Sequence, residues 1–322
     1  MFVWPGLTGY MGDCWRALAK RVELKVVADA RHAMSGGKYN AAEVLQGLDW
    51  SEELPSEWHP DAVFTVGWSN PLCVEAARRD WGPGVKRICC FDMPWRPGLR
   101  CFAARFALRR HVRLFDAAYV AGVSAAKYAR WLGFPKVETG LFSIDVKRFE
   151  RFDGFDSFKR SGSSSNVSNL SNLSNPSNFL FVGRKVREKG IETLKKAYEI
   201  YRQGGGQWTL TMPEWIDPKD VPGMMRAHAC LVLPSLWEPW GVVVAEAKAA
   251  GMKVIVSDKV GARLDIPCDE VVRAGDAKGL AAAMRRMERC DRFEKFDRLD
   301  RLEKFGCEAW TERVLKIVEG LK

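Results

Sequence analysis

Short apolar runs alternate with amphipathic stretches along the first half of the chain. The runs rich in β-branched and aromatic residues, which we expect to form strands, lie at 2–6, 22–30, 61–68, 85–92 and 116–123. Because helical spacing lies between these runs, the pattern predicts βαβ units and a parallel sheet with helices on both faces. Ligands bind beyond the carboxyl ends of such strands, so the loops after Trp4, Trp68 and Phe91 are the first candidates for a site.

A stretch of low complexity ends this first half. Residues 161–178 read SGSSSNVSNLSNLSNPSN and contain too few apolar side chains to pack, which favours a linker or a surface loop. Asn166, Asn169 and Asn172 stand in formal glycosylation sequons. The N-terminus has no basic segment before its first apolar run, which is not typical of a signal peptide, and we therefore expect no glycosylation.

The alternation of strands and helices restarts after this stretch. Strands are expected at 178–184, 208–213, 230–235 and 253–258, and helices at 191–203, 224–229 and 242–251. Apolar residues then recur at every third position from 284 to 305, which predicts a helix that breaks once or packs on more than one neighbour. We therefore predict four parts: a first Rossmann-like domain at 1–150, a linker or loop at 151–178, a second Rossmann-like domain at 179–304 and a C-terminal helix at 305–322.

Composition argues against disulfides, metal sites and membrane-spanning helices. Nine Cys is an odd count without a C-x-x-C pair, and the four His share no spacing typical of metal ligands. We therefore expect neither a disulfide framework nor a metal site, and a reducing compartment such as the cytoplasm. No run approaches the roughly 18 apolar residues that a membrane-spanning helix needs.

The net charge of +10 is concentrated in one block. Ten Lys/Arg stand between Arg78 and Arg113, against two Asp. Arg105, Arg109 and Arg113 are spaced four residues apart, which predicts a basic amphipathic helix for anionic lipid or for a phosphate-bearing acceptor. A solvated helix with excess arginine would have the same pattern. We expect no nucleic-acid binding, because no recognition motif accompanies the charge.

The residues that carry most chemistry follow two strands of the second half. Arg184 ends one strand, and Lys189 stands directly before the next helix. Glu238 lies in a turn that contains Pro and Gly, and Glu246 lies about one and a half turns into the helix after it. The N–H groups at the start of that helix favour binding of an anion, and the side chains of Arg184 and Lys189 would donate charge-assisted hydrogen bonds to the same anion. Each residue alone is typical of a solvated position. Their order and spacing together indicate a site whose cations bind a diphosphate and whose carboxylates accept hydrogen bonds from hydroxyl groups of the same ligand.

These segments resemble glycosyltransferase family 4, the retaining enzymes of the GT-B fold. The chain has FVGRKVREKG and PSLWEPWGVVVAEA where the donor domain of that family has closely similar motifs. The resemblance is strong over about 178–284, and looser over about 115–149. It implies an α/β protein of two Rossmann-like doubly wound domains that face a cleft, with the acceptor on the first domain and a nucleotide-diphosphate sugar on the second. It also implies that the C-terminal helix packs back on the first domain.

The resemblance also implies roles for individual residues. Arg184 and Lys189 would hold the donor diphosphate, and Glu246 would hold the ribose. Glu238 would contact the transferred sugar and stabilise charge near the reacting centre. The main chain that would cap sugar and phosphate oxygens is that of Trp240, Gly241, Val242 and Val243. No metal or other cofactor is expected, because cationic side chains and a helix dipole can neutralise the leaving diphosphate.

Two residues of the first half enter through the same resemblance. Gly9 belongs to a glycine-rich turn at 6–12, where small residues would let the main chain approach the donor phosphate or the acceptor. Many family members have a His near the sugar after the fourth strand, and here Asp92 stands near that place. Asp92 either takes this polar catalytic position or caps the next turn.

The implied activity is transfer of a sugar, with retention, from a nucleotide-diphosphate sugar to a glycan or lipid-linked acceptor. Synthesis of a cell-surface polysaccharide in the cytoplasm, or at the inner face of the membrane, is the expected setting. The alternatives are a phosphorylase or epimerase of the same fold, and a non-catalytic binding subunit. The donor base depends on the loop at 212–217 and stays open.

Overall fold

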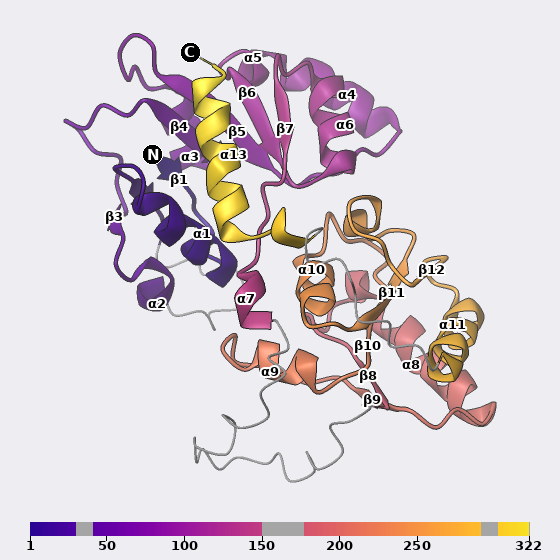
Figure 1. Ribbon diagram of the computed structural model, residues 1–322. Helices are drawn as coiled ribbons and strands as arrows, with labels where there is room; N and C mark the ends of the chain where they lie inside the picture. Colours follow the sequence, from indigo (N-terminus) through magenta and orange to yellow (C-terminus); the bar gives the residue numbers. More distant parts are fainter. Residues whose placement is uncertain (30–40, 150–176, 291–301, 322) are drawn as a thin grey trace. The chain divides into compact units, whose positions relative to one another are not determined.

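A computed structural model describes residues 1–29, 41–149, 177–290 and 302–321 of the chain (Figure 1). These residues form two compact units, Met1–Asp145 with Glu303–Lys322 as unit 1, and Val146–Leu302 as unit 2. Residues 151–176 of the predicted linker, with its three sequons, lie outside the described residues, and so does the part of the three-residue apolar repeat at 291–301. Each unit is described by itself.

Unit 1 contains a parallel sheet of seven strands in the order β3-β2-β1-β4-β5-β6-β7. The strands are β1 Phe2–Val3, β2 Lys25–Val27, β3 Asp49–Ser51, β4 Ala62–Val66, β5 Lys86–Phe91, β6 Ala117–Val120 and β7 Val137–Thr139. The five strands expected from the apolar runs are all present. The two edge strands, β3 and β7, were not predicted, because neither contains a buried residue and their sequences therefore lack an apolar pattern.

Helices cover both faces of this sheet. They are α1 Gly9–Ala19, α2 Ala41–Leu45, α3 Pro71–Arg78, α4 Leu99–Ala107, α5 Arg109–Val112, α6 Val123–Leu132 and α13 Cys307–Glu319. Phe2 and Phe64 pack with α1, α2 and α13 on one face, whereas Val3 and Val63 pack with α3 on the other. The C-terminal helix is part of this core: Trp310 is fully buried and donates its indole N–H to the Leu141 carbonyl at 2.8 Å.

The glycine-rich segment at 6–12 is only partly a turn. Helix α1 already begins at Gly9, so the expectation that Gly9 lies in a turn is wrong, and the turn is limited to the residues before it. Gly12 lies within the helix, where a Cβ atom would come within 2.6 Å of the Val44 carbonyl oxygen. A small residue is thus required at position 12 for close packing of α1 against α2.

The predicted basic helix is divided in two. Helix α4 ends at Ala107 and α5 begins at Arg109, with a distorted turn at Leu108 between them. This distortion separates a helix without a buried residue, α4, from a segment that turns Val112 and Phe115 into the core. Among the described residues, no helix is long and apolar enough to cross a membrane.

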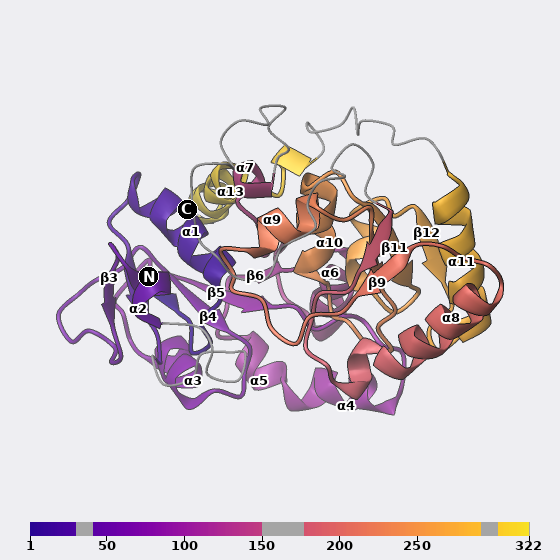
Figure 2. The same ribbon diagram turned by 90° about the horizontal axis from the view of Figure 1, so that it is seen from below.

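Unit 2 contains a second parallel sheet, in the order β12-β11-β10-β8-β9. Its strands are β8 Asn178–Leu180, β9 Thr209–Thr211, β10 Cys230–Leu233, β11 Lys253–Ser257 and β12 Glu270–Val272. Its helices are α7 Val146–Phe149, α8 Ile191–Gln203, α9 Val221–Arg226, α10 Val242–Ala249 and α11 Ala277–Arg289, with 3-10 turns at Arg187–Lys189 and Gly261–Leu264. Helices α8 and α11 pack side by side (Figures 1 and 2). The strands from 178 to 258 agree with the prediction, and the edge strand β12 was not expected.

Candidate functional site

The strand order of unit 2 creates a point where the chain connections diverge. Strands β8 and β10 are neighbours, but β8 continues through α8 to β9 at one edge, and β10 continues through α10 to β11 in the opposite direction. Ligands of doubly wound sheets bind beyond the carboxyl ends of the strands at such a switch point. The segment after β8 contains Arg184 and Lys189, and the segment after β10 contains Glu238.

Main-chain hydrogen bonds hold these two segments together. The carbonyl of Glu188 accepts hydrogen bonds from the N–H groups of Leu236 (2.8 Å) and Trp237 (3.1 Å). Gly190 lies at this junction with φ +72°, and a Cβ atom there would come within 2.2 Å of the Pro234 carbonyl oxygen. A glycine at position 190 therefore permits both the left-handed backbone and the close approach of the two segments.

A third segment fixes the turn that contains Glu238. The N–H of Glu238 donates to the Lys259 carbonyl (3.2 Å), and the Glu238 carbonyl accepts from Gly261 (3.1 Å). The indole of Trp240 is buried and donates to Asp265 at 3.0 Å. Trp240 thus contributes an anchored main chain to the site, while its side chain belongs to the core of unit 2.

Lys189 and Glu238 form an ion pair although 49 residues separate them in sequence. Both side chains are mostly buried, with 18% and 11% of their surface exposed. The hydroxyl of Ser235 donates a further hydrogen bond to Glu238 at 3.4 Å. A partly buried charge pair of this kind orients both side chains, and an incoming phosphate would compete with the carboxylate for the lysine.

Helix α10 starts directly after this turn. Gly241 is its N-cap residue, with φ +102° and no side chain that caps the helix. The N–H groups of Val242 and Val243 belong to the first turn of the helix, where an α-helix offers no partner within itself. The N-terminus of α10 therefore presents N–H donors and a positive dipole end beside Lys189 and Glu238.

Glu246 lies on the second turn of α10. Burial raises the pKa of its carboxyl from 4.5 to about 7, and the nearby guanidinium of Arg148 on α7 opposes this shift. Among the described residues, no side chain or main-chain group forms a hydrogen bond with this carboxyl. A carboxylate in this state can accept two hydrogen bonds from a ligand with neighbouring hydroxyl groups.

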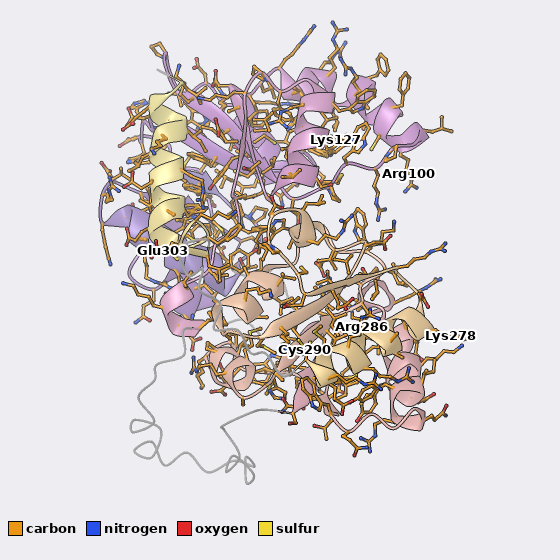
Figure 3. All side chains as sticks on the ribbon, turned by 45° about the vertical axis from the view of Figure 1, so that its right-hand side comes forward. Arg100, Lys127, Lys278, Arg286, Cys290 and Glu303 are labelled. Carbon is orange, nitrogen blue, oxygen red and sulfur yellow. The ribbon has the colours of Figure 1, made fainter. Side chains whose placement is uncertain are left out.

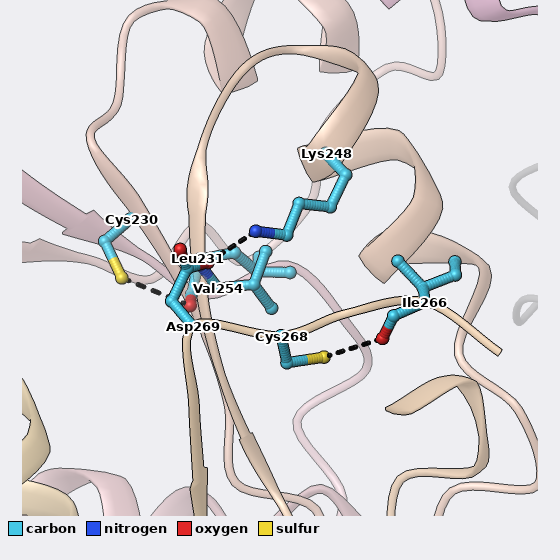
Figure 4. Close-up of polar contacts among 7 residues, drawn as sticks. All are labelled: Cys230, Leu231, Lys248, Val254, Ile266, Cys268 and Asp269. Atoms are coloured by element: carbon cyan, nitrogen blue, oxygen red, sulfur yellow. Dashed lines mark hydrogen bonds and ion pairs between the residues drawn. The ribbon is translucent and has the colours of Figure 1, made fainter. Parts of the chain in front are cut away.

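The far end of α10 is anchored in the core (Figure 4). Lys248 has only 2% of its side chain exposed and pairs with Asp269. Asp269 also accepts a hydrogen bond from the N–H of Val254 in β11 at 2.7 Å. Because Lys248 is two residues after Glu246 on the same helix, this pair fixes the rotation of α10 and hence the direction of Glu246.

Arg184 lies beside a cavity in unit 2. The guanidinium of Arg184 is exposed and makes no ion pair or hydrogen bond with the described residues. The adjacent residues border a cavity of about 700 Å³. Its walls come from the turn after β8, the start of α8, the loop after β9 and the loop after β10, and include Lys185, Arg187, Met212, Glu214 and Leu236.

Eight of the ten predicted site residues thus belong to unit 2, and Gly9 and Asp92 belong to unit 1. Gly9 is the first residue of α1, after β1, and Asp92 directly follows β5 and is half-buried. Two contributors were missed from the sequence. Arg148 lies in the region of looser resemblance at about 115–149, where no site residue was expected. The loop at 259–262 has the sequence of an ordinary connection, and only its hydrogen bonds to Glu238 connect it to the site.

Part of the chain matches a known protein family. Residues 205–304 match the family model described as glycosyl transferases group 1, a range that includes Glu238 and Glu246 and begins after Arg184 and Lys189. No sequence among the curated proteins matches the chain significantly.

Solved structures share the fold over almost the whole chain. Sucrose-phosphate synthase from Thermosynechococcus elongatus has a TM-score of 0.67 at 16% identity, covering 100% of this chain and 99% of its own. HepE from Anabaena, solved with UDP, has a TM-score of 0.69 at 12% identity and covers 99% of both chains. A glycosyltransferase from Rickettsia africae has a TM-score of 0.70 at 12% identity, covering 99% and 98%.

These likenesses show the fold, which is GT-B, with two α/β domains that each contain a parallel sheet. On this fold, the match of residues 205–304 to the glycosyl transferases group 1 model confirms the prediction that the chain is a glycosyltransferase.

Proposed function

We propose that this glycosyltransferase transfers a hexose-like sugar, with retention of anomeric configuration, from a nucleotide-diphosphate sugar to a glycan or lipid-linked acceptor. The observation that carries the proposal is the convergence at the β8/β10 switch point of unit 2. There Lys189 forms an ion pair with Glu238 in the turn before α10, and Arg184 lies exposed on the segment that contains Lys189. Glu246, whose carboxyl accepts no hydrogen bond from the described residues, lies on the second turn of α10. This is a set of donors for a diphosphate and of acceptors for hydroxyl groups.

The proposed roles follow from these contacts. Arg184 and Lys189 bind the diphosphate, and the first-turn N–H groups of α10 share its charge. When Lys189 binds a phosphate oxygen, Glu238 is released from its ion pair and can accept hydrogen bonds from the transferred sugar. Glu246 accepts the ribose hydroxyls. The departing phosphate accepts the acceptor proton, so that no protein nucleophile and no metal are required.

We propose that the cavity bordered by Met212 and Leu236 holds the base of the donor. It adjoins Arg184 through Lys185, and it contains part of the loop at 212–217 from which base selection was expected. UDP is the first nucleotide to test, because HepE of the same fold has been solved with UDP and with UDP-glucose. The cytoplasmic setting and a role in cell-surface polysaccharide synthesis are part of the same proposal.

Binding of UDP, GDP and ADP by calorimetry tests the donor site. Arg184→Ala and Lys189→Ala are each expected to weaken binding of the preferred diphosphate by roughly 10- to 100-fold, because each removes a charge-assisted hydrogen bond. Lys196→Ala, an exposed position on α8, is the control and leaves the affinity unchanged. Unchanged affinity in both site variants would remove the basis for the donor site.

Product analysis separates the rival activities. The proposed enzyme releases a nucleoside diphosphate only when an acceptor is present, with the anomeric configuration of the donor in the product. Epimerised nucleotide sugar without acceptor would identify an epimerase. Sugar phosphate formed from a glycan and inorganic phosphate would identify a phosphorylase. Tight nucleotide binding without turnover on any glycan or lipid-linked acceptor would favour a non-catalytic subunit. Gly9 keeps its proposed role of letting the main chain approach the donor phosphate or the acceptor. Asp92 keeps its proposed role on the acceptor side, where Asp92→Asn is expected to lower kcat and leave UDP affinity unchanged.

A further inference from the structure

Helix α4 of unit 1 exposes an apolar stripe that the described residues of that unit leave largely uncovered. Leu99, Phe102 and Phe106 have 89%, 56% and 64% of their surface exposed, and α4 contains no buried residue. Their spacing of three and four residues places them on one side of the helix, and the rings of Phe102 and Phe106 lie 5.4 Å apart.

The opposite side of α4 is held against the unit. Cys101, Ala104 and Leu108 pack on a hydrophobic cluster that includes residues of α6, and α4 contacts α6. The guanidinium of Arg105 lies over the ring of Trp131 and donates to the Trp131 carbonyl at 2.8 Å. Arg105 therefore holds α4 against α6. This differs from the expectation that Arg105 shares a cationic face with Arg109 and Arg113. The helix is fixed with its phenylalanines facing outward.

The charge around the stripe has one sign. Residues 93–115 contain six arginines, at positions 96, 100, 105, 109, 110 and 113, and no acidic residue. Arg100 lies in the first turn of α4 (Figure 3), and Arg109 and Arg110 follow its last turn; all three are exposed. Arginines thus stand at both ends of the apolar stripe.

We propose that α4 lies in the surface of an anionic lipid bilayer, with Leu99, Phe102 and Phe106 inserted below the headgroups and the flanking arginines on the lipid phosphates. A helix with large apolar side chains on one side and arginine around it binds membranes in this orientation. Charge complementarity selects this occupant, because an exposed apolar stripe with only positive neighbours repels a second copy of itself. The proposal goes beyond the sugar transfer and does not depend on which donor is bound.

Vesicle flotation of the full chain tests it. The chain is expected to float with vesicles of phosphatidylcholine and phosphatidylglycerol, and not with phosphatidylcholine alone, and high salt is expected to release it. Phe102→Ser with Phe106→Ser is expected to lower partitioning on the order of tenfold. Arg100→Gln and Arg110→Gln are each expected to lower it about fivefold.

Matched controls come from unit 2. Leu264→Ser and Val271→Ser remove apolar side chains of similar exposure, at 47% and 49%, and Lys278→Gln removes an exposed charge. These variants are expected to partition like the unaltered chain. Calorimetry of each variant, in which both unfolding transitions are expected to persist, shows that both units are folded. UDP affinity, measured in parallel, keeps failure of the donor site distinct from failure of the surface.

Three outcomes would overturn the proposal. They are equal binding to neutral and anionic vesicles, no flotation with either, and flotation that the phenylalanine and arginine variants leave unchanged. A dimer in size-exclusion chromatography that depends on Phe102 and Phe106, without flotation, would assign the stripe to a second copy of the chain.

Discussion

Replacement of Glu246 by glutamine is expected to raise the stability of unit 2 and to lower its affinity for a nucleotide. Burial raises the pKa of this carboxyl from 4.5 to about 7. The folded chain therefore binds more protons than the unfolded chain between these two pH values. Stability depends on pH through this difference, so the free energy of unfolding falls as the pH rises across the window, and it is lowest above about 7.

The size of the effect follows from the shift. A change in pKa from 4.5 to about 7 corresponds to roughly 3 kcal/mol, and solvent contact of the half-buried side chain reduces this to roughly 1 to 3 kcal/mol. Glutamine has a similar shape and no charge. The substitution therefore removes the cost of burying a charged carboxylate at pH 8, and it changes the free energy of unfolding little near pH 4.5. For a unit of this size the gain at pH 8 corresponds to a rise in Tm of roughly 2 to 10 °C.

Differential scanning calorimetry of the full chain at pH 5 and pH 8 measures this change. The transition of unit 2 is identified as the one that UDP shifts upward. At pH 8, Glu246→Gln is also expected to weaken UDP binding about tenfold, because the ribose hydroxyls lose a charged acceptor. Glu199→Gln, on the exposed side of α8, is the control and leaves both measurements unchanged.

Two results would refute the reasoning. If Glu246→Gln keeps the pH dependence of the unaltered chain, burial does not penalise the charged carboxyl. If stability rises at pH 8 but UDP affinity is unchanged, Glu246 is a buried carboxyl that does not hold the ribose.

Three further substitutions test how the units are built. Gly190→Ala is expected to destabilise unit 2 by roughly 2 to 4 kcal/mol, because the added Cβ would lie 2.2 Å from a main-chain oxygen; Gly251→Ala, at a similar φ with open space around it, is expected to cost only about 1 kcal/mol in the same melt. Lys248→Met is expected to lower the Tm of unit 2 by an amount corresponding to about 2 kcal/mol, and a double variant that also neutralises its ion-pair partner should recover part of the loss. Trp310→Ala is expected to lower the other calorimetric transition by an amount corresponding to roughly 3 to 5 kcal/mol, with UDP affinity intact; loss of the UDP-sensitive transition instead would contradict the placement of this residue in unit 1.

The strands of both sheet centres could be predicted because their signal is local. A strand buried on both faces, such as β5 or β10, is a continuous apolar run between turn residues, and this can be read without knowledge of its neighbours. The edge strands β3, β7 and β12 are half-exposed, so their residues lack that pattern and only their pairing defines them.

The sequence by itself also indicated candidate side chains for binding a diphosphate and a sugar, because the prediction rests on residue type and order within two short motifs. Only the tertiary structure decided how these residues act on one another. The ion pair between Lys189 and Glu238 joins two loops 49 residues apart, and it exists because β8 and β10 are neighbours in the sheet. The raised pKa of Glu246 comes from burial on α10, and Trp310 lies in the core of unit 1 because the chain returns there after unit 2. Both depend on parts of the chain far away in sequence, and no local pattern contains that information.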